Sequence, residues 1–131
     1  WITLQQGVDF VLKCMERMDG GEIFVPKIPS VRIVDLAKAM APDLPIKTIG
    51  IRPGEKLHEI MCPSDDSHLT VEFDNYFIIT PSITFFARKT DFTENSLGEK
   101  GHVVEQGFEY NSGSNFDFLD IDDIIKYNEM S

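Results

Sequence analysis

The chain has 131 residues, of which 42% are apolar and 11% aromatic, and its formal net charge is -10. This much apolar material is enough for one soluble globular domain with its own core. The strong negative charge argues against a nucleic-acid partner, because phosphate backbones are held by clustered Lys and Arg. No apolar run approaches the roughly 18 to 20 residues of a membrane span, and no secretory leader is recognisable. We therefore expect a segment that neither crosses a membrane nor is secreted.

The first elements in chain order are a helix and a strand. Apolar residues from Leu4 to Met18 recur at steps of three and four, which predicts an amphipathic helix with one buried face. Thr3 is suited to cap the start of this helix, and Gly20-Gly21 to end it. Residues 22–25 then read as a short buried strand that is closed by a proline.

The middle of the chain predicts a second helix and several strands. The second helix is expected over about 34–41, and the alternation at 46–51 predicts a half-buried strand. Residues 57–61 fit either an extended segment or a single helical turn. The runs 70–73 and 76–80 predict a hairpin with a two-residue loop.

The last third of the chain has a different character. Residues 87–115 are rich in polar and charged side chains, and we expect a long loop or arm that orders against a partner. A short helix with acidic residues at its start is predicted around 120–127. The expected fold class is therefore mixed α/β, with a substrate-binding region at 1–86 and a C-terminal arm with a terminal helix at 87–131.

The turn at 50–59 is the strongest candidate for a ligand contact. The Pro53-Gly54 pair indicates a tight reversal, and the proline favours extended geometry for Arg52, at the end of the predicted strand. Arg52 and Lys56 can hold a phosphate group through charge-assisted hydrogen bonds. Lys27 and the neighbourhood of the first helix start extend this predicted ligand-facing surface. Solvated surface side chains are the alternative at each of these positions.

The histidines and cysteines do not form a recognisable catalytic or metal-binding set. His58, His68 and His102 lie in different elements without metal-ligand spacing, although His58 remains an alternative as a base. Cys14 and Cys62 are far apart in sequence, and we expect two reduced thiols in a cytoplasmic protein. The sequence has neither a glycine-rich dinucleotide motif nor a Walker motif, so no cofactor site is expected in this chain.

Three motifs in order carry a resemblance to a known family. They are the sequences at 22–30, 35–39 and 49–59, the last of which contains the run RPGEKLHE. Together they resemble the C-terminal part of the inverting UDP-N-acetylglucosamine 4,6-dehydratases. These belong to the extended short-chain dehydrogenase/reductases, with the capsular polysaccharide dehydratases, and open bacterial pseudaminic acid synthesis. The resemblance is strong over 1–81 and looser through 108–112.

The resemblance implies that catalysis and substrate binding belong to different parts of a larger enzyme. NADP and a catalytic Tyr-Lys pair would lie in a Rossmann domain outside this sequence. There, hydride leaves C4 of the sugar, water is lost across C5 and C6, and hydride returns to C6. The present segment would close over the UDP-sugar and be inactive alone. Arg52 would contact the diphosphate, Glu55 the nucleotide or ribose, and Lys27 would lie near the nucleotide.

Two alternatives to this assignment stay open from the sequence. A related dehydratase or epimerase acting on another UDP-sugar would share the same motifs. A non-catalytic binding or oligomerisation module, in which 87–115 and the terminal helix make subunit contacts, belongs to a different class. In either case we expect a homo-oligomer.

Overall fold

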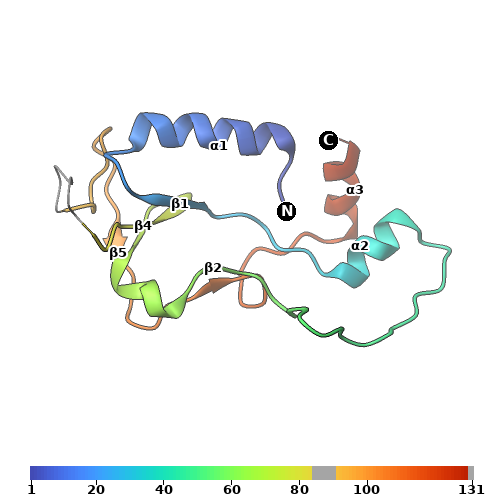
Figure 1. Cartoon of the computed structure of the whole chain (residues 1–131). Helices are drawn as coiled ribbons and strands as arrows, with labels where there is room; N and C mark the ends of the chain where they lie inside the picture. Colours follow the sequence, from blue (N-terminus) through green and yellow to red (C-terminus); the bar gives the residue numbers. More distant parts are fainter. Residues whose placement is uncertain (84–90, 130–131) are drawn as a thin grey trace.

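The computed structural model describes residues 1–83 and 91–129. The first helix runs along a small antiparallel sheet, and the other two α-helices pack against each other away from that sheet (Figure 1). The predicted boundary between 86 and 87 lies outside the described residues. The mixed α/β class is confirmed. The elements are α1 (Leu4–Arg17), β1 (Ile23–Pro26), α2 (Ile33–Met40), β2 (Ile60–Cys62), the 3-10 helix η1 (Ser64–Leu69), β3 (Thr70–Glu72), β4 (Tyr76–Ile79), β5 (His102–Val103), β6 (Tyr110–Asn111) and α3 (Ile121–Glu129).

The main sheet has four antiparallel strands in the order β1-β4-β3-β5, and β2 pairs with β6 in a separate two-stranded ladder. The predicted hairpin is confirmed, since β3 and β4 pair directly, with Val71 opposite Ile78. Pro26 is the last residue of β1 and lies opposite Tyr76. A proline is tolerated there because β1 is an edge strand of this sheet.

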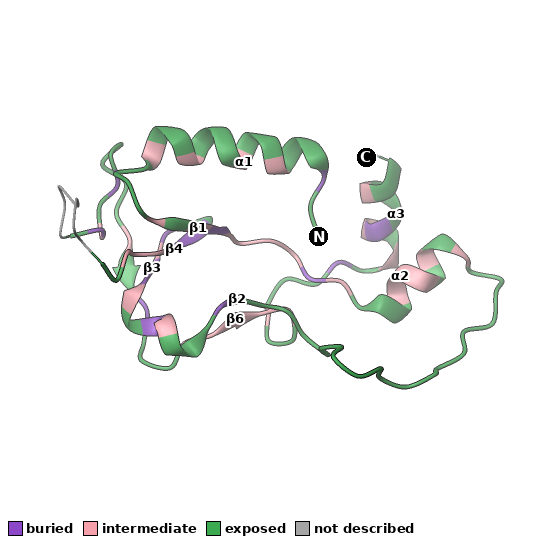
Figure 2. Cartoon of the chain, viewed as in Figure 1, coloured by how far each residue is buried: buried purple, intermediate pink, exposed green. Residues whose placement is uncertain are grey.

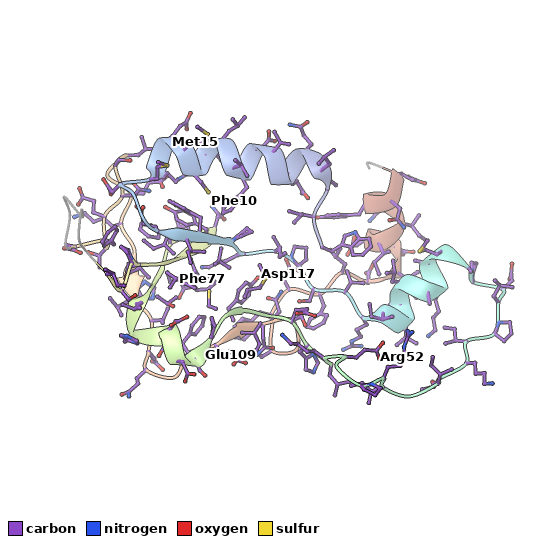
Figure 3. The ribbon with its side chains drawn as sticks, viewed as in Figure 1. Phe10, Met15, Arg52, Phe77, Glu109 and Asp117 are labelled. Atoms are coloured by element: carbon purple, nitrogen blue, oxygen red, sulfur yellow. The ribbon has the colours of Figure 1, made fainter. Side chains whose placement is uncertain are left out.

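Two apolar clusters form the core, on opposite faces of β4. Alternate residues of a strand point to opposite sides, so Tyr76 and Ile78 belong to one cluster and Phe77 to the other. The first cluster packs against Phe10 of α1, which lies on the side of the helix that faces β1 (Figure 3). The second contains Cys62 of β2 and packs against Tyr110 of β6. The sheet therefore lies between α1 and the β2-β6 pair.

Helix α1 forms as predicted, but its apolar stripe is not buried. The Thr3 hydroxyl accepts a hydrogen bond from the Gln6 N–H, and the Gln6 side chain accepts one from the Thr3 N–H, so the helix starts with a capping box. Within the described residues this chain does not cover the predicted face, and Phe10 is the residue of α1 that packs against the first cluster. The stripe residues are 45 to 83% exposed, and they are Leu4, Val8, Val11, Leu12, Met15 and Met18.

The predicted strand at 46–51 is also wrong. These residues are part of an exposed connection between α2 and β2 that pairs with no described strand (Figure 2). Alternating apolar residues favour a strand only when a neighbouring strand supplies hydrogen bonds and a surface to cover one face. Here Ile46, Ile49 and Ile51 are all exposed. Arg52 consequently lies in a loop and not at the end of a strand.

The expectation of an arm at 87–115 is corrected for its described part, 91–115. Strand β5 pairs with β3, and β6 pairs with β2, so this part of the chain belongs to the same folded unit as the first 83 residues. Short strands of two residues are invisible to a sequence pattern, because they show no period. The polar composition of 91–115 therefore gave no indication that backbone hydrogen bonds hold this segment to the rest of the chain.

A polar network joins the end of α1 to the loop before β5. The Arg17 guanidinium donates two hydrogen bonds to Glu99, at 2.7 Å and 2.8 Å. Asn95 donates to both Glu99, at 2.6 Å, and the Tyr76 hydroxyl, at 2.8 Å. The bonds from Arg17, assisted by the bond from Asn95, lower the pKa of Glu99 from 4.5 to about 2.

We expect Glu99→Gln to remove an acid-sensitive part of the stability. Because the pKa of Glu99 is lower in the folded protein, its contribution is full above pH 4.5 and is lost as the pH falls toward 2. The carboxylate is partly solvated, so we expect a loss of only about 1 kcal/mol at pH 7. Urea denaturation at pH 7, 4 and 3 measures this difference. The exposed Glu105→Gln is the matched control, and an equal pH profile for both variants would contradict the assignment.

Candidate functional site

Arg52 and Glu55 lie together in a tight turn, as the Pro-Gly pair predicts. Gly54 has a φ of 84°, which favours glycine, and the Glu55 N–H donates to the Arg52 carbonyl at 3.1 Å. The Glu55 carboxylate accepts from the Arg52 Nε at 2.9 Å and from the Arg52 backbone N–H at 2.7 Å. The Arg52 side chain is 74% exposed, so its remaining guanidinium donors face solvent.

The turn adjoins a hollow that is open to solvent. Figure 3 shows Arg52 on the loop that connects α2 to β2, well away from Phe77 in the sheet. The hollow measures about 690 Å³ and includes Glu55 and Lys56 in its lining, together with the backbone around Gly50. The lining carries one cation, Lys56, and two carboxylates, Glu55 and Glu59, and the Arg52 guanidinium lies in the adjoining turn. Such a set can take a phosphate group and, beside it, hydroxyl groups.

Lys27 lies elsewhere and is already paired. It directly follows β1, and its Nζ contacts Glu72 Oε1 at 2.6 Å and the Asp74 carbonyl at 3.1 Å. The same ammonium lies 4.9 Å from the centre of the Phe77 ring, which is a cation–π distance. Its charge is therefore largely balanced within this chain.

A second hollow, also about 690 Å³, lies between α1 and the tip of the β3-β4 hairpin and includes Lys27. Its lining shares no residue with the hollow beside the turn. Thr3 is buried and caps α1. The predicted single surface of Arg52, Lys56, Lys27 and the Thr3 neighbourhood is thus divided. The structure brings Arg52 and Glu55 together and places Lys27 in another hollow.

Sequence reasoning missed the contacts that reach the Lys27 loop from the C-terminal part. The Tyr110 hydroxyl accepts from the Ile28 N–H at 2.9 Å and donates to the Ile28 carbonyl at 3.0 Å. Asn115 donates to the same carbonyl at 2.8 Å and to the Ser30 hydroxyl at 3.0 Å. The only signal in the sequence is the run of Asn and Ser side chains, which favour local hydrogen bonds to the backbone.

The remaining candidates for chemistry have structural environments. Burial raises the pKa of the Cys62 thiol to about 11, so this group is unreactive, and Cys14 also has a raised pKa from burial. His58 is exposed. Within 1–83 and 91–129, no group of three or more His, Cys, Asp or Glu side chains could hold a metal ion. None of the helices in these ranges has the length and hydropathy that a membrane span requires.

The fold of this chain is also found in a solved structure. The structure of Pen from Bacillus thuringiensis matches 98% of this chain and 38% of its own length, with a TM-score of 0.72 and 24% identity. At this identity the likeness establishes a shared fold and nothing more. The chain is therefore a mixed α/β unit whose fold recurs as part of a larger protein.

The sequence establishes the family. Residues 1–81 match the polysaccharide biosynthesis protein family, and the chain belongs to it. It is 63% identical over 115 residues to a UDP-N-acetylglucosamine 4,6-dehydratase (inverting) of Campylobacter jejuni serotype O:2, and 61% identical to that of serotype O:23/36. Each match covers 88% of this chain and 34% of the relative, so the chain spans about a third of their length.

A more distant relative is 37% identical over 91 residues, 61% of this chain and 27% of its own length. It is an uncharacterized membrane protein of Methanocaldococcus jannaschii. The predicted resemblance to the inverting 4,6-dehydratases is confirmed by the two Campylobacter proteins.

Proposed function

We propose that this chain is the UDP-sugar-binding part of an inverting UDP-N-acetylglucosamine 4,6-dehydratase. The observation that carries the proposal is the 63% identity to the Campylobacter dehydratase. The enzyme would be a cytoplasmic, NADP-dependent lyase in bacterial surface-glycan synthesis, supplying the first step toward pseudaminic acid. The segment alone would bind substrate without turning it over.

The described residues do not fit an NADP site. A dinucleotide is normally held where a glycine-rich turn follows a parallel strand and opens a helix. The main sheet here is wholly antiparallel, and the sequence has no such glycine-rich motif. The cofactor and the Tyr-Lys pair would therefore belong to another part of the enzyme. The contribution of this chain is to bind and orient the UDP-sugar.

Arg52 would contact the diphosphate. The chain carries a net charge of -10, so a dianionic ligand needs local positive charge to offset the unfavourable overall field. Arg52 supplies a guanidinium with solvent-facing donors, and Lys56, in the lining of the adjoining hollow, adds a second cation. Glu55 would accept hydrogen bonds from ribose hydroxyls while it orients Arg52. Lys27 would lie near the nucleotide, but its pairing with Glu72 leaves the larger electrostatic share to Arg52.

A chimera tests this proposal. In the Campylobacter jejuni serotype O:2 enzyme, the matching third is replaced with this chain, and UDP-N-acetylglucosamine turnover is followed by proton NMR. We expect the dehydrated 4-keto sugar with inverted C5. An epimerised sugar without loss of water would favour a related UDP-sugar enzyme instead. A folded chimera that binds NADP but converts no UDP-sugar would contradict the proposal.

A binding or oligomerisation module is the second candidate, and the exposed apolar stripe of α1 is the observation that favours it. Calorimetric titration of the 131-residue chain with UDP, combined with light scattering, separates the two. Saturable binding supports the partial substrate site. Stable self-association without UDP binding supports the module. Homo-oligomerisation of the whole enzyme remains compatible with the first outcome.

A further inference from the structure

The 110–115 segment contacts both loops that carry the predicted ligand contacts. On one side, Tyr110 and Asn115 hydrogen-bond to Ile28, the residue after Lys27. On the other side, β6 pairs with β2, which directly follows the turn at 50–59, with Asn111 opposite Ile60. This segment therefore lies between two loops that are separated in sequence by more than twenty residues.

Ser112 holds the end of the Arg52 turn. Its backbone N–H donates to the Glu59 carbonyl at 2.9 Å, and its hydroxyl accepts from the Glu59 N–H at 3.0 Å. The two bonds are reciprocal, so they fix both the position and the orientation of Glu59. They act seven residues after Arg52, in a stretch that is otherwise exposed.

Gly113 allows a close approach by His58. A Cβ atom at Gly113 would lie 2.6 Å from the His58 Nδ1 and 2.7 Å from its Cγ, which is far inside van der Waals contact. The imidazole thus lies directly against the backbone of the segment. A larger residue at position 113 has to displace the ring.

The segment itself has a defined shape. The Asn111 side-chain oxygen accepts hydrogen bonds from the N–H groups of Gly113 and Ser114, each at 2.8 Å. An Asn side chain that bonds to the backbone two and three residues on stabilises a turn. The contacts to Glu59 and His58 are therefore made by an ordered loop.

We propose that the 110–115 segment positions the Arg52 turn for the UDP-sugar. By binding the Lys27 loop and the end of the turn at once, it sets their separation and so the place of the Arg52 guanidinium. The proposal rests on the proposed function, because the ligand at Arg52 is the UDP diphosphate. Ser112 and Gly113 act through Glu59 and His58, as positioning residues without ligand contact.

Three variants of the 131-residue chain test the role of the Ser112 hydroxyl. Ser112→Ala removes one bond to Glu59, Ser112→Thr keeps the hydroxyl, and Ser114→Ala is the matched control, since Ser114 contributes its backbone N–H to the loop. We measure amide hydrogen exchange at 50–59 and the Kd for UDP. Loss of one hydrogen bond corresponds to about a fivefold change in an equilibrium constant. Ser112→Ala should therefore raise the rate of amide exchange at 50–59 and the Kd for UDP by about that factor. Threonine should restore both, and Ser114→Ala should change neither.

Gly113→Ala provides a second, independent test. We expect it to weaken UDP binding about as much as Ser112→Ala, and His58→Ala in the same chain should relieve the effect by removing the ring. Faster exchange at 50–59 with an unchanged Kd for UDP would overturn the positioning role while leaving the proposed function intact. No UDP binding by the unsubstituted chain would count against the proposed substrate site itself, and the positioning role would fall with it.

Discussion

Arg52→Ala is expected to weaken UDP binding by about 10- to 100-fold. A hydrogen bond between a guanidinium and a phosphate is charge-assisted and contributes roughly 1.5 to 3 kcal/mol. The substitution also removes one of the cations that offset the net charge of -10. Isothermal titration of the 131-residue chain with UDP measures the effect. In the chimeric enzyme the same change should raise KM for the UDP-sugar more than it lowers kcat.

Lys47→Ala is the matched control for this prediction. Lys47 lies in the same exposed connection as Arg52, so its loss changes the net charge by the same amount. A general electrostatic effect would weaken UDP binding equally in both variants. Only a direct contact between Arg52 and UDP makes the Kd of Arg52→Ala much higher than that of Lys47→Ala. An unchanged Kd for Arg52→Ala would show that Arg52 is not part of the site.

Phe77→Ala is expected to unfold most of the chain at 25 °C. Phe77 is buried in β4, and its ring packs against Phe108 and Tyr110 with centroid distances of 5.2 Å and 5.0 Å. Truncation of such a side chain typically costs about 3 to 5 kcal/mol, which is a large part of the stability of a small domain. Circular dichroism during urea denaturation measures the lost free energy of unfolding.

The control is Phe116→Ala, which removes the same atoms from a fully exposed side chain. Its free energy of unfolding should stay within about 0.5 kcal/mol of the unsubstituted chain. If both variants had the same urea midpoint, the cluster around Phe77 would not be the core of this chain.

The elements that sequence reasoning predicted correctly depend on neighbouring residues. The predicted Thr3 cap of α1 bonds to Gln6, three residues on, and the β3-β4 hairpin closes within a few residues. The Arg52–Glu55 turn is likewise a local structure, set by a Pro-Gly pair. Such contacts form with little loss of chain entropy, so their residue types and spacing carry enough information.

The wrong predictions concern features that depend on residues far apart in the sequence. Alternation at 46–51 predicts a strand, but strand formation requires a partner that the described residues do not provide. The periodicity of α1 predicts an apolar face correctly, yet cannot say whether this chain covers it, and Met15 is 66% exposed. At 91–115, strands of two residues are too short to show a pattern.

The sequence by itself determined the family, the order of the main helices and the hairpin, and the tight turn at Pro53-Gly54, whereas the pairing of Glu55 with Arg52 in that turn was seen only in the structure. Only the tertiary structure decided that Lys27 pairs with Glu72, and that Tyr110 hydrogen-bonds to Ile28 across 82 positions. Contacts between residues so far apart in the sequence form only when the sheet brings their segments together. The spacing of residues along the chain does not predict them. The UDP-sugar contact proposed here is therefore inferred from a ten-residue turn, while the hydrogen bonds between Ser112 and the end of that turn were seen only in the fold.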